Sequence, residues 1–285
     1  RQRQMCIRDR LAAEARCDHY WICSKLQTLS YEEQLKEKEK QVVDAFQRIG
    51  GFTDFKINTV RSAENKYNYR NKMEFTFSPH RWILESEPEG VDSSFALGLH
   101  IPGRYDKILD IDTCHIQPYI GNKILGITRE VCLKNLDLKP YDPKTNIGFL
   151  RHLMLRFGVK TNQLMVNIVT AYDDINKLSP LIDTLLKEVP EITSMVNNVN
   201  TRKADVAFGE FENLIFGNSF IEEKIGNLKF EISANSFFQT NTYQGKVLYD
   251  EVLKIAGLNG DEIVYDLYCG TCLLYTSDAA DDQLG

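Results

Sequence analysis

The side chains best suited to chemistry lie near the end of the sequence, within residues 231–272. Residues 262–270 form a short apolar run that ends at Cys269-Gly270, which is typical of a buried strand that runs into a glycine turn of an open α/β sheet. Such a turn lets backbone N–H groups approach a ligand, and Asp266 could orient the loop or meet a cationic ligand. The plainer alternative is a strand that simply ends at a glycine.

A second polar group precedes this run. Phe237 and Phe238 are followed at once by Gln239, Thr240 and Asn241, so apolar bulk adjoins side chains that need hydrogen-bond partners. A segment of this kind commonly packs into a core and presents its amides to a pocket. The alternative is an ordinary turn that leads into the next helix, which the helical spacing of apolar residues predicts over 242–256.

These segments resemble the RNA (uracil-5-)-methyltransferase family, whose members use S-adenosylmethionine to make 5-methyluridine in transfer and ribosomal RNA; the matching stretches read SANSFFQTN and GLNGDEIVYDLYCG. The resemblance implies that Gln239 and Tyr268 contact the methyl donor. It places Asp266 and Gly270 in the same donor loop.

The resemblance also implies a mechanism. In the family, a cysteine thiolate adds to C6 of uridine, C5 takes the methyl group, and a carboxylate base then removes the C5 proton. The nucleophile and the base of the family follow the donor loop, whereas only 19 residues follow Asp266 here. We therefore expect this sequence to be a truncated, inactive fragment in which the catalytic residues are not encoded.

Three cysteines are candidate metal ligands. Taken alone, thiols at the spacing of Cys17 and Cys23 are more often ordinary thiols than ligands. The ribosomal branch of the family carries an iron–sulfur cluster on a C-x5-C-x2-C run and a distant fourth cysteine, and Cys17, Cys23 and Cys114 match three of these positions. The third position of the run is not a cysteine here, and a 4Fe-4S cluster normally binds four thiolates. A cluster is therefore expected at most in a labile or incomplete form.

A basic, aromatic stretch is the nucleic-acid signal. Residues 56–82 contain six basic residues against two acidic ones, a local charge of +4, and Tyr67 and Tyr69 lie among them. Basic groups beside aromatic rings suit phosphate contact together with base stacking. A solvated strand edge whose lysines oppose aggregation is the alternative.

Two stretches near these residues match the family as well. Residues 69–72 read YRNK and residues 150–156 read LRHLMLR, and a third match includes Arg104. The resemblance implies RNA contact, or bracing of the domain interface, for a set of mostly basic side chains: Tyr69, Arg70, Lys72, Arg104, Arg151, His152 and Arg156.

Composition limits the class of protein. The 285 residues are 43% hydrophobic with a formal net charge of −6, which argues against a uniformly basic nucleic-acid binder but leaves room for a local basic face. No apolar run is long enough to span a bilayer, so no membrane association is expected. Seven cysteines without a secretory signal favour a reducing, cytoplasmic compartment, and no protein partner is indicated.

Periodicity predicts the elements that position these residues. A helix should begin at the Ser30 cap and end at Gly50-Gly51. Further helices are predicted over 119–135 and 175–189, and strands over 72–78, 96–100, 107–111, 150–157, 163–170 and 193–200. The strand over 72–78 alternates apolar and polar residues, as a half-buried antiparallel strand does.

The fold class predicted is α/β and α+β: a central antiparallel-sheet α+β domain followed by the truncated start of a Rossmann-like S-adenosylmethionine-dependent methyltransferase domain. The predicted divisions are a cysteine-containing segment with a helix (13–52), the RNA-binding domain (53–230) and the start of the methyltransferase domain (231–271). Residues 1–12 and 272–285 fit no neighbouring pattern and are expected to be foreign tails; genuine disordered termini are the alternative.

The expected substrate is 23S rRNA, because residues 98–111 (GLHIPGRYDKILDI) and the cysteine pattern resemble the ribosomal branch. A transfer-RNA uracil-5-methyltransferase and a non-catalytic RNA-binding module remain the alternatives.

Overall fold

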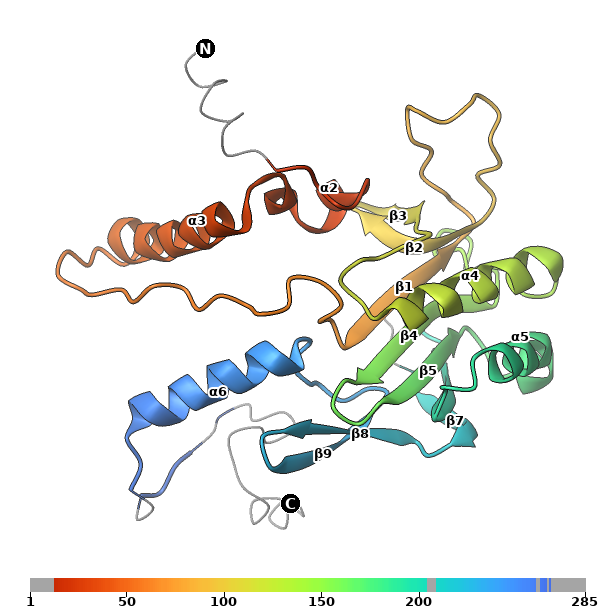
Figure 1. Ribbon diagram of the computed structural model, residues 1–285. Helices are drawn as coiled ribbons and strands as arrows, with labels where there is room; N and C mark the ends of the chain where they lie inside the picture. The colour runs from red at the N-terminus through yellow and green to blue at the C-terminus, as the bar shows by residue number, and fades with distance from the viewer. Residues whose placement is uncertain (1–12, 204–208, 260–261, 266, 268–285) are drawn as a thin grey trace. The chain divides into compact units, whose positions relative to one another are not determined.

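The computed structural model describes residues 13–203, 209–259, 262–265 and 267 (Figure 1). The chain divides into two compact units, one that ends at Asn65 and one that begins at Lys66. The domain boundaries at 52 and 230 stay predictions, since a compact unit need not coincide with a functional domain.

The first unit is helical. Its elements are α2 (Tyr20–Cys23), the 3₁₀ helix η1 (Lys25–Thr28), α3 (Tyr31–Asp44) and the π-helical η2 (Ala45–Ile49). The Ser30 hydroxyl caps α3 by accepting from the backbone N–H of Glu33 at 3.4 Å, which confirms the predicted helix start. The Tyr31 hydroxyl accepts from the backbone N–H of Ala63 at 2.7 Å and so ties the extended end of the unit back to α3.

The second unit is built on one large sheet. Within the described residues it has seven strands, in the order β3-β2-β1-β4-β5-β6-β7, and every pairing is antiparallel except that of β5 with β6. The strands are β1 (Lys72–Ser78), β2 (Ala96–Ile101), β3 (Arg104–Asp110), β4 (Leu150–Gly158), β5 (Gln163–Thr170), β6 (Ser194–Val199) and β7 (Phe211–Gly217). This mixed, mostly antiparallel sheet confirms the predicted fold class, and all six predicted strands up to residue 200 are present.

Two helices lie side by side on one face of this sheet, α4 (Tyr119–Lys134) and α5 (Ile175–Glu188) (Figure 1). Both carry fully buried leucine or isoleucine side chains, among them Ile124, Leu125, Leu178 and Leu181. Helix α5 makes the crossover that the parallel β5–β6 pair requires.

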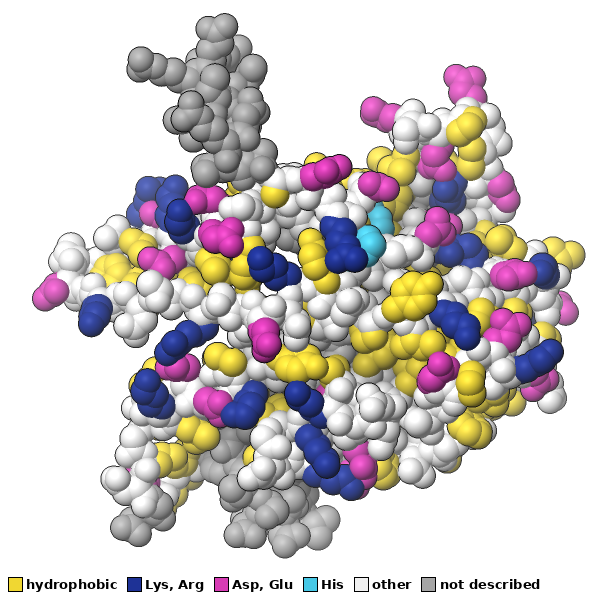
Figure 2. Space-filling model, in the orientation of Figure 1, with side chains coloured by type: hydrophobic (Ala, Val, Ile, Leu, Met, Phe, Trp, Pro, Cys, Tyr) yellow, Lys and Arg dark blue, Asp and Glu magenta, His cyan; other side chains and the backbone are white. Residues whose placement is uncertain are grey.

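The surface is mixed in charge. Acidic and basic side chains are intermixed over the face that Figure 2 shows. In the part of the chain that the structure describes, no helix combines the length and apolar character needed to cross a membrane.

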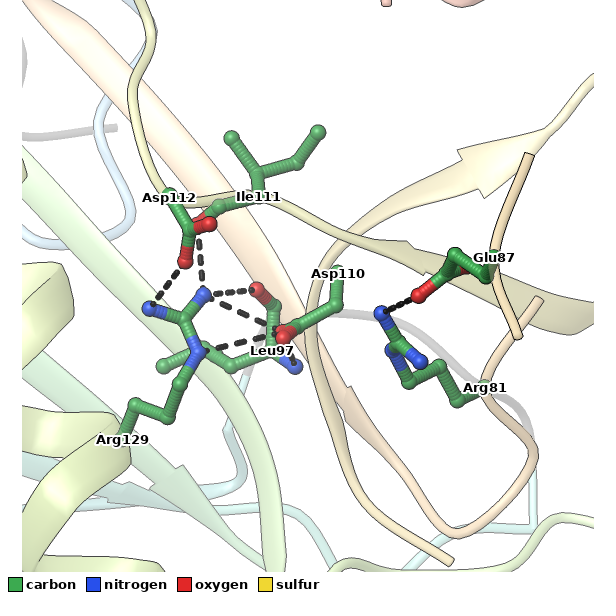
Figure 3. Close-up of polar contacts among 7 residues, drawn as sticks. All are labelled: Arg81, Glu87, Leu97, Asp110, Ile111, Asp112 and Arg129. Atoms are coloured by element: carbon green, nitrogen blue, oxygen red, sulfur yellow. Dashed lines mark hydrogen bonds and ion pairs between the residues drawn. The ribbon is translucent and has the colours of Figure 1, made fainter. Parts of the chain in front are cut away.

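Arg129 fastens α4 to the ends of β2 and β3 (Figure 3). Its Nη2 donates to the Ile111 carbonyl at 2.5 Å and to Asp110 Oδ1 at 3.1 Å, and its Nη1 lies 3.2 Å from Asp112 Oδ1. Asp110 Oδ1 also accepts from the backbone N–H of Leu97 at 2.8 Å. One guanidinium therefore satisfies polar groups of two strands and fixes the position of the helix on the sheet.

A hairpin of β8 (Phe220–Ile225) and β9 (Leu228–Ser233) packs against the large sheet, and α6 (Thr242–Ala256) follows it. Ile221, Ile225 and Ile232 of the hairpin share a core cluster with Met165 of β5 and Val196 of β6. Phe238 joins the same cluster, so the predicted packing of the Phe237-Phe238 segment into a core is confirmed for the second phenylalanine. Sequence periodicity predicted α6 to the residue but missed β7, β8 and β9.

The strand predicted over 262–270 is not seen in the residues described. Residues 262–265 have no regular secondary structure, Leu267 lies in a turn, and the side chains of Ile263, Tyr265 and Leu267 are exposed. A buried strand needs neighbouring strands to satisfy its backbone groups, and no described strand pairs with these residues.

Candidate functional site

The YRNK and SANSFFQTN motifs meet in space. The backbone N–H of Asn71 donates to the Thr240 carbonyl at 2.8 Å, and Arg70 forms an isolated antiparallel bridge with Asn241. We call the contact of residues 70–72 with residues 239–242 the junction. It joins the start of β1 to the turn that enters α6.

The Asn71 side chain holds the junction together. Its buried Nδ2 donates to the Gln239 carbonyl at 2.8 Å and to the Thr242 hydroxyl at 2.9 Å. The Asn71 carbonyl accepts from the backbone N–H of Phe157 in β4 at 2.9 Å. A single asparagine therefore connects the sheet, the Phe237-Phe238 segment and the first turn of α6.

Glu223 of β8 is hydrogen-bonded to the junction through Thr242. Its fully buried carboxylate accepts from the backbone N–H groups of Val159 at 2.8 Å and Lys160 at 2.9 Å, and from the Thr242 hydroxyl at 2.9 Å. Buried polar groups are costly unless they are hydrogen-bonded, and these contacts meet that requirement. The carboxylate links the β4–β5 turn to the N-terminal residue of α6.

Arg156 of β4 holds the other end of the same segment. Its Nε donates to the Ala234 carbonyl at 3.1 Å, and its Nη2 donates to the Ser236 carbonyl. Burial lowers the pKa of Arg156 to about 10, since the low-dielectric interior disfavours the charge. The guanidinium remains cationic at neutral pH and braces residues 234–236.

A pocket of about 170 Å³ opens beside the junction, and we call it the junction pocket. It is lined by Arg70, Lys72, Glu74, Ser236, Phe237, Phe238 and Thr240. Burial, followed by the nearby charge of Arg156, lowers the pKa of Lys72. The Phe237 ring is 64% exposed. Two cations next to an exposed ring can hold a phosphate and stack a base.

Gln239 is the donor-site candidate that the structure describes. Its carbonyl is fixed by Asn71, and its side chain is partly exposed next to Gly245 of α6, where an added Cβ would lie 3.4 Å from Gln239 Cβ. Asn241 caps α6 by accepting from the backbone N–H of Gln244 at 3.1 Å. A partly exposed amide anchored at a helix start fits the polar part of a methyl donor. Asp266, Tyr268 and Gly270 lie outside the described residues.

The other RNA candidates are spread over the second unit. Tyr69 is half-buried next to Arg70, whereas Arg104 is exposed and donates to Asp106 at 3.0 Å. Arg151 is buried, stacks on the Tyr141 ring at 4.0 Å and donates to the Arg202 carbonyl at 2.7 Å. The buried His152 ring lies 3.2 Å from the Thr76 hydroxyl. The structure thus brings Arg70, Lys72 and Arg156 to the junction, and gives Arg104, Arg151 and His152 other neighbours.

The three candidate metal ligands are divided between the two units: Cys17 and Cys23 belong to the first and Cys114 to the second. The exposed Cys23 thiol donates to the Tyr20 carbonyl at 3.7 Å. Cys17 and Cys114 are buried, and burial raises the pKa of the Cys114 thiol. Among the residues that the structure describes, no group of three or more His, Cys, Asp or Glu side chains could hold a metal ion. The roles of Cys17, Cys23 and Cys114 as cluster ligands stay predictions.

Sequence reasoning missed Glu223, although the sequence carries a signal for it. Residues 220–225 read FIEEKI, and period-2 alternation places Glu223 on the same strand face as Ile221 and Ile225. All three are buried. A carboxylate on an apolar strand face indicates a hydrogen-bonding role.

No family model matches the chain. Curated relatives do match. Over 265 residues the chain is 42% identical to an uncharacterised RNA methyltransferase of Chlorobaculum tepidum, and over 265 residues it is 40% identical to one of Porphyromonas gingivalis. These alignments cover 90% of this chain but 54% and 57% of the two relatives. The chain spans about half the length of the curated relatives it matches.

A solved structure is similar as well. The tRNA (uracil-54, C5)-methyltransferase of Pyrococcus abyssi, in complex with S-adenosyl-L-homocysteine, superimposes with a TM-score of 0.67 at 27% identity. The superposition covers 93% of this chain and 55% of that one.

Proposed function

Because the chain belongs to the RNA (uracil-5-)-methyltransferase family, we propose that the whole protein methylates C5 of uridine in RNA, with S-adenosylmethionine as the methyl donor. The neighbour from Pyrococcus abyssi carries S-adenosyl-L-homocysteine, which is the product of such a transfer. The chain contributes the RNA-binding surface and part of the donor site.

The observation that carries this proposal is the hydrogen bonding of Asn71. Arg70 and Lys72, on either side of it, line a pocket suited to RNA, while its side chain holds the carbonyl of Gln239. A strand of RNA bound at Arg70 and Lys72 therefore lies next to the candidate donor residue. Methyl transfer needs substrate and donor in contact, and preorganised proximity is a large part of catalysis.

Each group of residues has a distinct part in this proposal. Gln239, with Asp266, Tyr268 and Gly270, orients the donor, which supplies an electrophilic methyl group when bound. Tyr69, Arg70 and Lys72 hold the RNA strand. Arg156 braces the donor-side segment, since its guanidinium is buried against two carbonyls.

The chemical step draws on residues further along the whole protein. A cysteine thiolate adds to C6 of uridine, and the electron pair that reaches C5 forms the new bond to the methyl carbon. The methyl–sulfur bond of the donor breaks as this bond forms, and its electron pair leaves with the sulfur of S-adenosylhomocysteine. A carboxylate base takes the C5 proton, and the thiolate is expelled as the C5–C6 double bond returns. The target base must leave its stack to reach such a site.

We propose 23S rRNA as the substrate, on the resemblance of residues 98–111 and of the cysteine positions to the ribosomal branch. Transfer RNA is the second candidate, favoured by the name of the Pyrococcus abyssi neighbour. A non-catalytic RNA-binding module would use the same surface without the chemical step. With either RNA substrate, we propose a cytoplasmic location.

The test uses the full-length protein with S-adenosylmethionine and either 23S rRNA or transfer RNA that lacks 5-methyluridine. We expect 5-methyluridine in the nucleoside digest of the 23S rRNA, measured by mass spectrometry.

Arg70→Ala should weaken RNA binding about tenfold at low salt, because a phosphate-contacting cation is lost. Lys187→Ala, an exposed lysine on α5, is the matched control and should bind normally. Absence of 5-methyluridine from both RNAs would contradict the methyltransferase proposal, and unchanged binding by Arg70→Ala would contradict the RNA surface.

A further inference from the structure

A second pocket lies away from the junction, where loops after β5 and β6 meet the loop before β4. Its volume is about 450 Å³, within the roughly 300–1,000 Å³ typical of ligand sites. Tyr141, Asn146, Tyr172, Asn200 and Lys203 are among the residues that line it, together with Arg151. We call it the tyrosine pocket. Arg151 lies five residues from Arg156 on β4, so the backbone positions of the two arginines are about 17 Å apart.

The rings of Tyr141 and Tyr172 in this pocket are held in place by neighbouring side chains. The Tyr141 ring stacks on the Arg151 guanidinium at 4.0 Å, and the Tyr141 hydroxyl donates to Asn146 Oδ1 at 2.9 Å. The Tyr172 ring lies 4.8 Å from that of Phe149, and its hydroxyl accepts from Lys177 Nζ at 2.8 Å. The Tyr172 side chain nevertheless stays 42% exposed. A ring that is fixed and exposed, as that of Tyr172 is, makes a stacking platform, since little side-chain entropy is lost when a ligand binds. Tyr141 is only 7% exposed and forms part of the pocket wall.

The polar groups around the rings suit a heterocycle with a negatively charged tail. The exposed Asn146 amide can donate to a base edge, while its Oδ1 accepts from the Tyr141 hydroxyl. Asn200 is fully buried, and its Oδ1 accepts from the backbone N–H of Arg202 at 3.0 Å. The charged residues that line the described part of the pocket, Arg151 and Lys203, are both basic. A planar base stacked on the exposed Tyr172 ring with its phosphate near Lys203 matches this arrangement.

We propose that the tyrosine pocket binds an unpaired nucleobase of the RNA substrate, away from the uridine that is methylated. RNA-binding proteins read single-stranded positions in this way, by stacking splayed bases on aromatic rings and hydrogen-bonding their edges. The inference rests on the proposed function, which supplies an RNA bound along the same sheet. It adds a second anchor, and so a basis for choosing one RNA over another.

The test measures binding of a short, fluorescently labelled single-stranded RNA to the 285-residue chain by fluorescence anisotropy. Tyr172→Ala should weaken binding about tenfold, as expected for the loss of one stacked base. Tyr172→Phe retains the ring and should bind like wild type. Tyr119→Ala removes a tyrosine that is 81% exposed on α4 and does not line the pocket, and it should also bind like wild type. Circular dichroism melting of each variant checks that the chain remains folded.

The outcomes separate this inference from the proposed function. Wild-type affinity in Tyr172→Ala, with weakened binding in Arg70→Ala, overturns the tyrosine pocket and leaves the proposed function standing. Failure of the wild-type chain to bind RNA overturns both. In a second arm, adenosine 5′-monophosphate is titrated against the chain: binding that depends on Tyr172, while RNA affinity does not, assigns the pocket to a free nucleotide and overturns the RNA assignment.

Discussion

Two buried arginines on β4, Arg156 and Arg151, have different surroundings and different parts in the molecule. Arg156 is 4% exposed and donates hydrogen bonds to the carbonyls of Ala234 and Ser236. Arg151 is 1% exposed, lies against the Tyr141 ring, and lines the tyrosine pocket. The first guanidinium holds backbone in place, and the second holds a ring in place.

The regions around the two arginines differ as well. The junction is a closed network of buried hydrogen bonds among Asn71, Glu223 and Thr242, with few groups in contact with water. The region around Arg151 combines stacked rings with ion pairs whose cations are exposed, Arg104–Asp106 and Lys144–Asp106. We infer that the junction keeps residues 234–242 in a fixed position. The tyrosine pocket, as proposed above, instead contributes to the choice of one RNA over another. The two should therefore respond differently to mutation, salt and pH.

The largest effect is expected for Glu223→Ala. The substitution leaves the Val159 and Lys160 N–H groups and the Thr242 hydroxyl without their buried acceptor. Each buried group left unsatisfied costs about 1–3 kcal/mol, so the free energy of unfolding should fall by roughly 3 kcal/mol or more. Urea denaturation followed by circular dichroism measures the change.

The matched control for this variant is Glu222→Ala. Glu222 is the preceding residue on β8, and its partly exposed carboxylate pairs with Lys229. An exposed ion pair contributes at most about 1 kcal/mol, so the control should be nearly as stable as wild type. Equal destabilisation by the two variants would show that Glu223 is not the support of the junction.

A smaller and more local effect is expected for Arg156→Met. Methionine fills similar space but cannot donate to the Ala234 and Ser236 carbonyls, which costs about 1–3 kcal/mol, offset in part because no charge is then buried. Amide hydrogen exchange should accelerate across residues 233–242. Arg151→Met should leave exchange in that segment unchanged and instead affect residues around Tyr141. Faster exchange over 233–242 in both variants would remove the distinction between the two arginines.

Sequence patterns predicted most helices and strands correctly, but not the contacts between segments that lie far apart in the sequence. The alternation of Met73, Phe75 and Phe77 predicted β1 correctly, although the strand is not half-buried, since Thr76 and Ser78 on its other face are buried as well. Strands β7 to β9 were missed: Phe211, Leu214 and Phe216 are exposed on β7, so its apolar residues do not mark a buried face.

The two motifs of the candidate site were predicted from the sequence, but their contact with each other was not. The motifs at 69–72 and 233–241 lie more than 160 residues apart in sequence, and only the fold shows that Asn71 joins them. Sequence also treated Arg151 and Arg156 alike, because arginine suits phosphate contact, buried hydrogen bonding and ring stacking equally well. A bulge between Leu150 and His152 further interrupts the alternation that would have indicated the direction of Arg151.

The smallest effect is expected at Asp106, beside Arg151 and Tyr141. Hydrogen bonds from Arg104, and then from Lys144, hold the pKa of Asp106 well below its ordinary value of about 3.9. A lowered folded-state pKa contributes stability that is present above the unfolded-state pKa and is lost as the pH falls below about 4 toward the folded-state value. Asp106→Asn should therefore lower the Tm by no more than ~3 °C near neutral pH.

This difference between Asp106→Asn and wild type should shrink in acid, because the wild-type carboxylate is then protonated as well. It should also shrink as salt is raised, since exposed charges are screened. The Glu223→Ala difference should not depend on salt, because its hydrogen bonds are buried. Thermal melts of both variants at low and high salt test this directly: a salt-independent Asp106→Asn effect, or a salt-sensitive Glu223→Ala effect, would mean that the two regions are stabilised by the same kind of interaction.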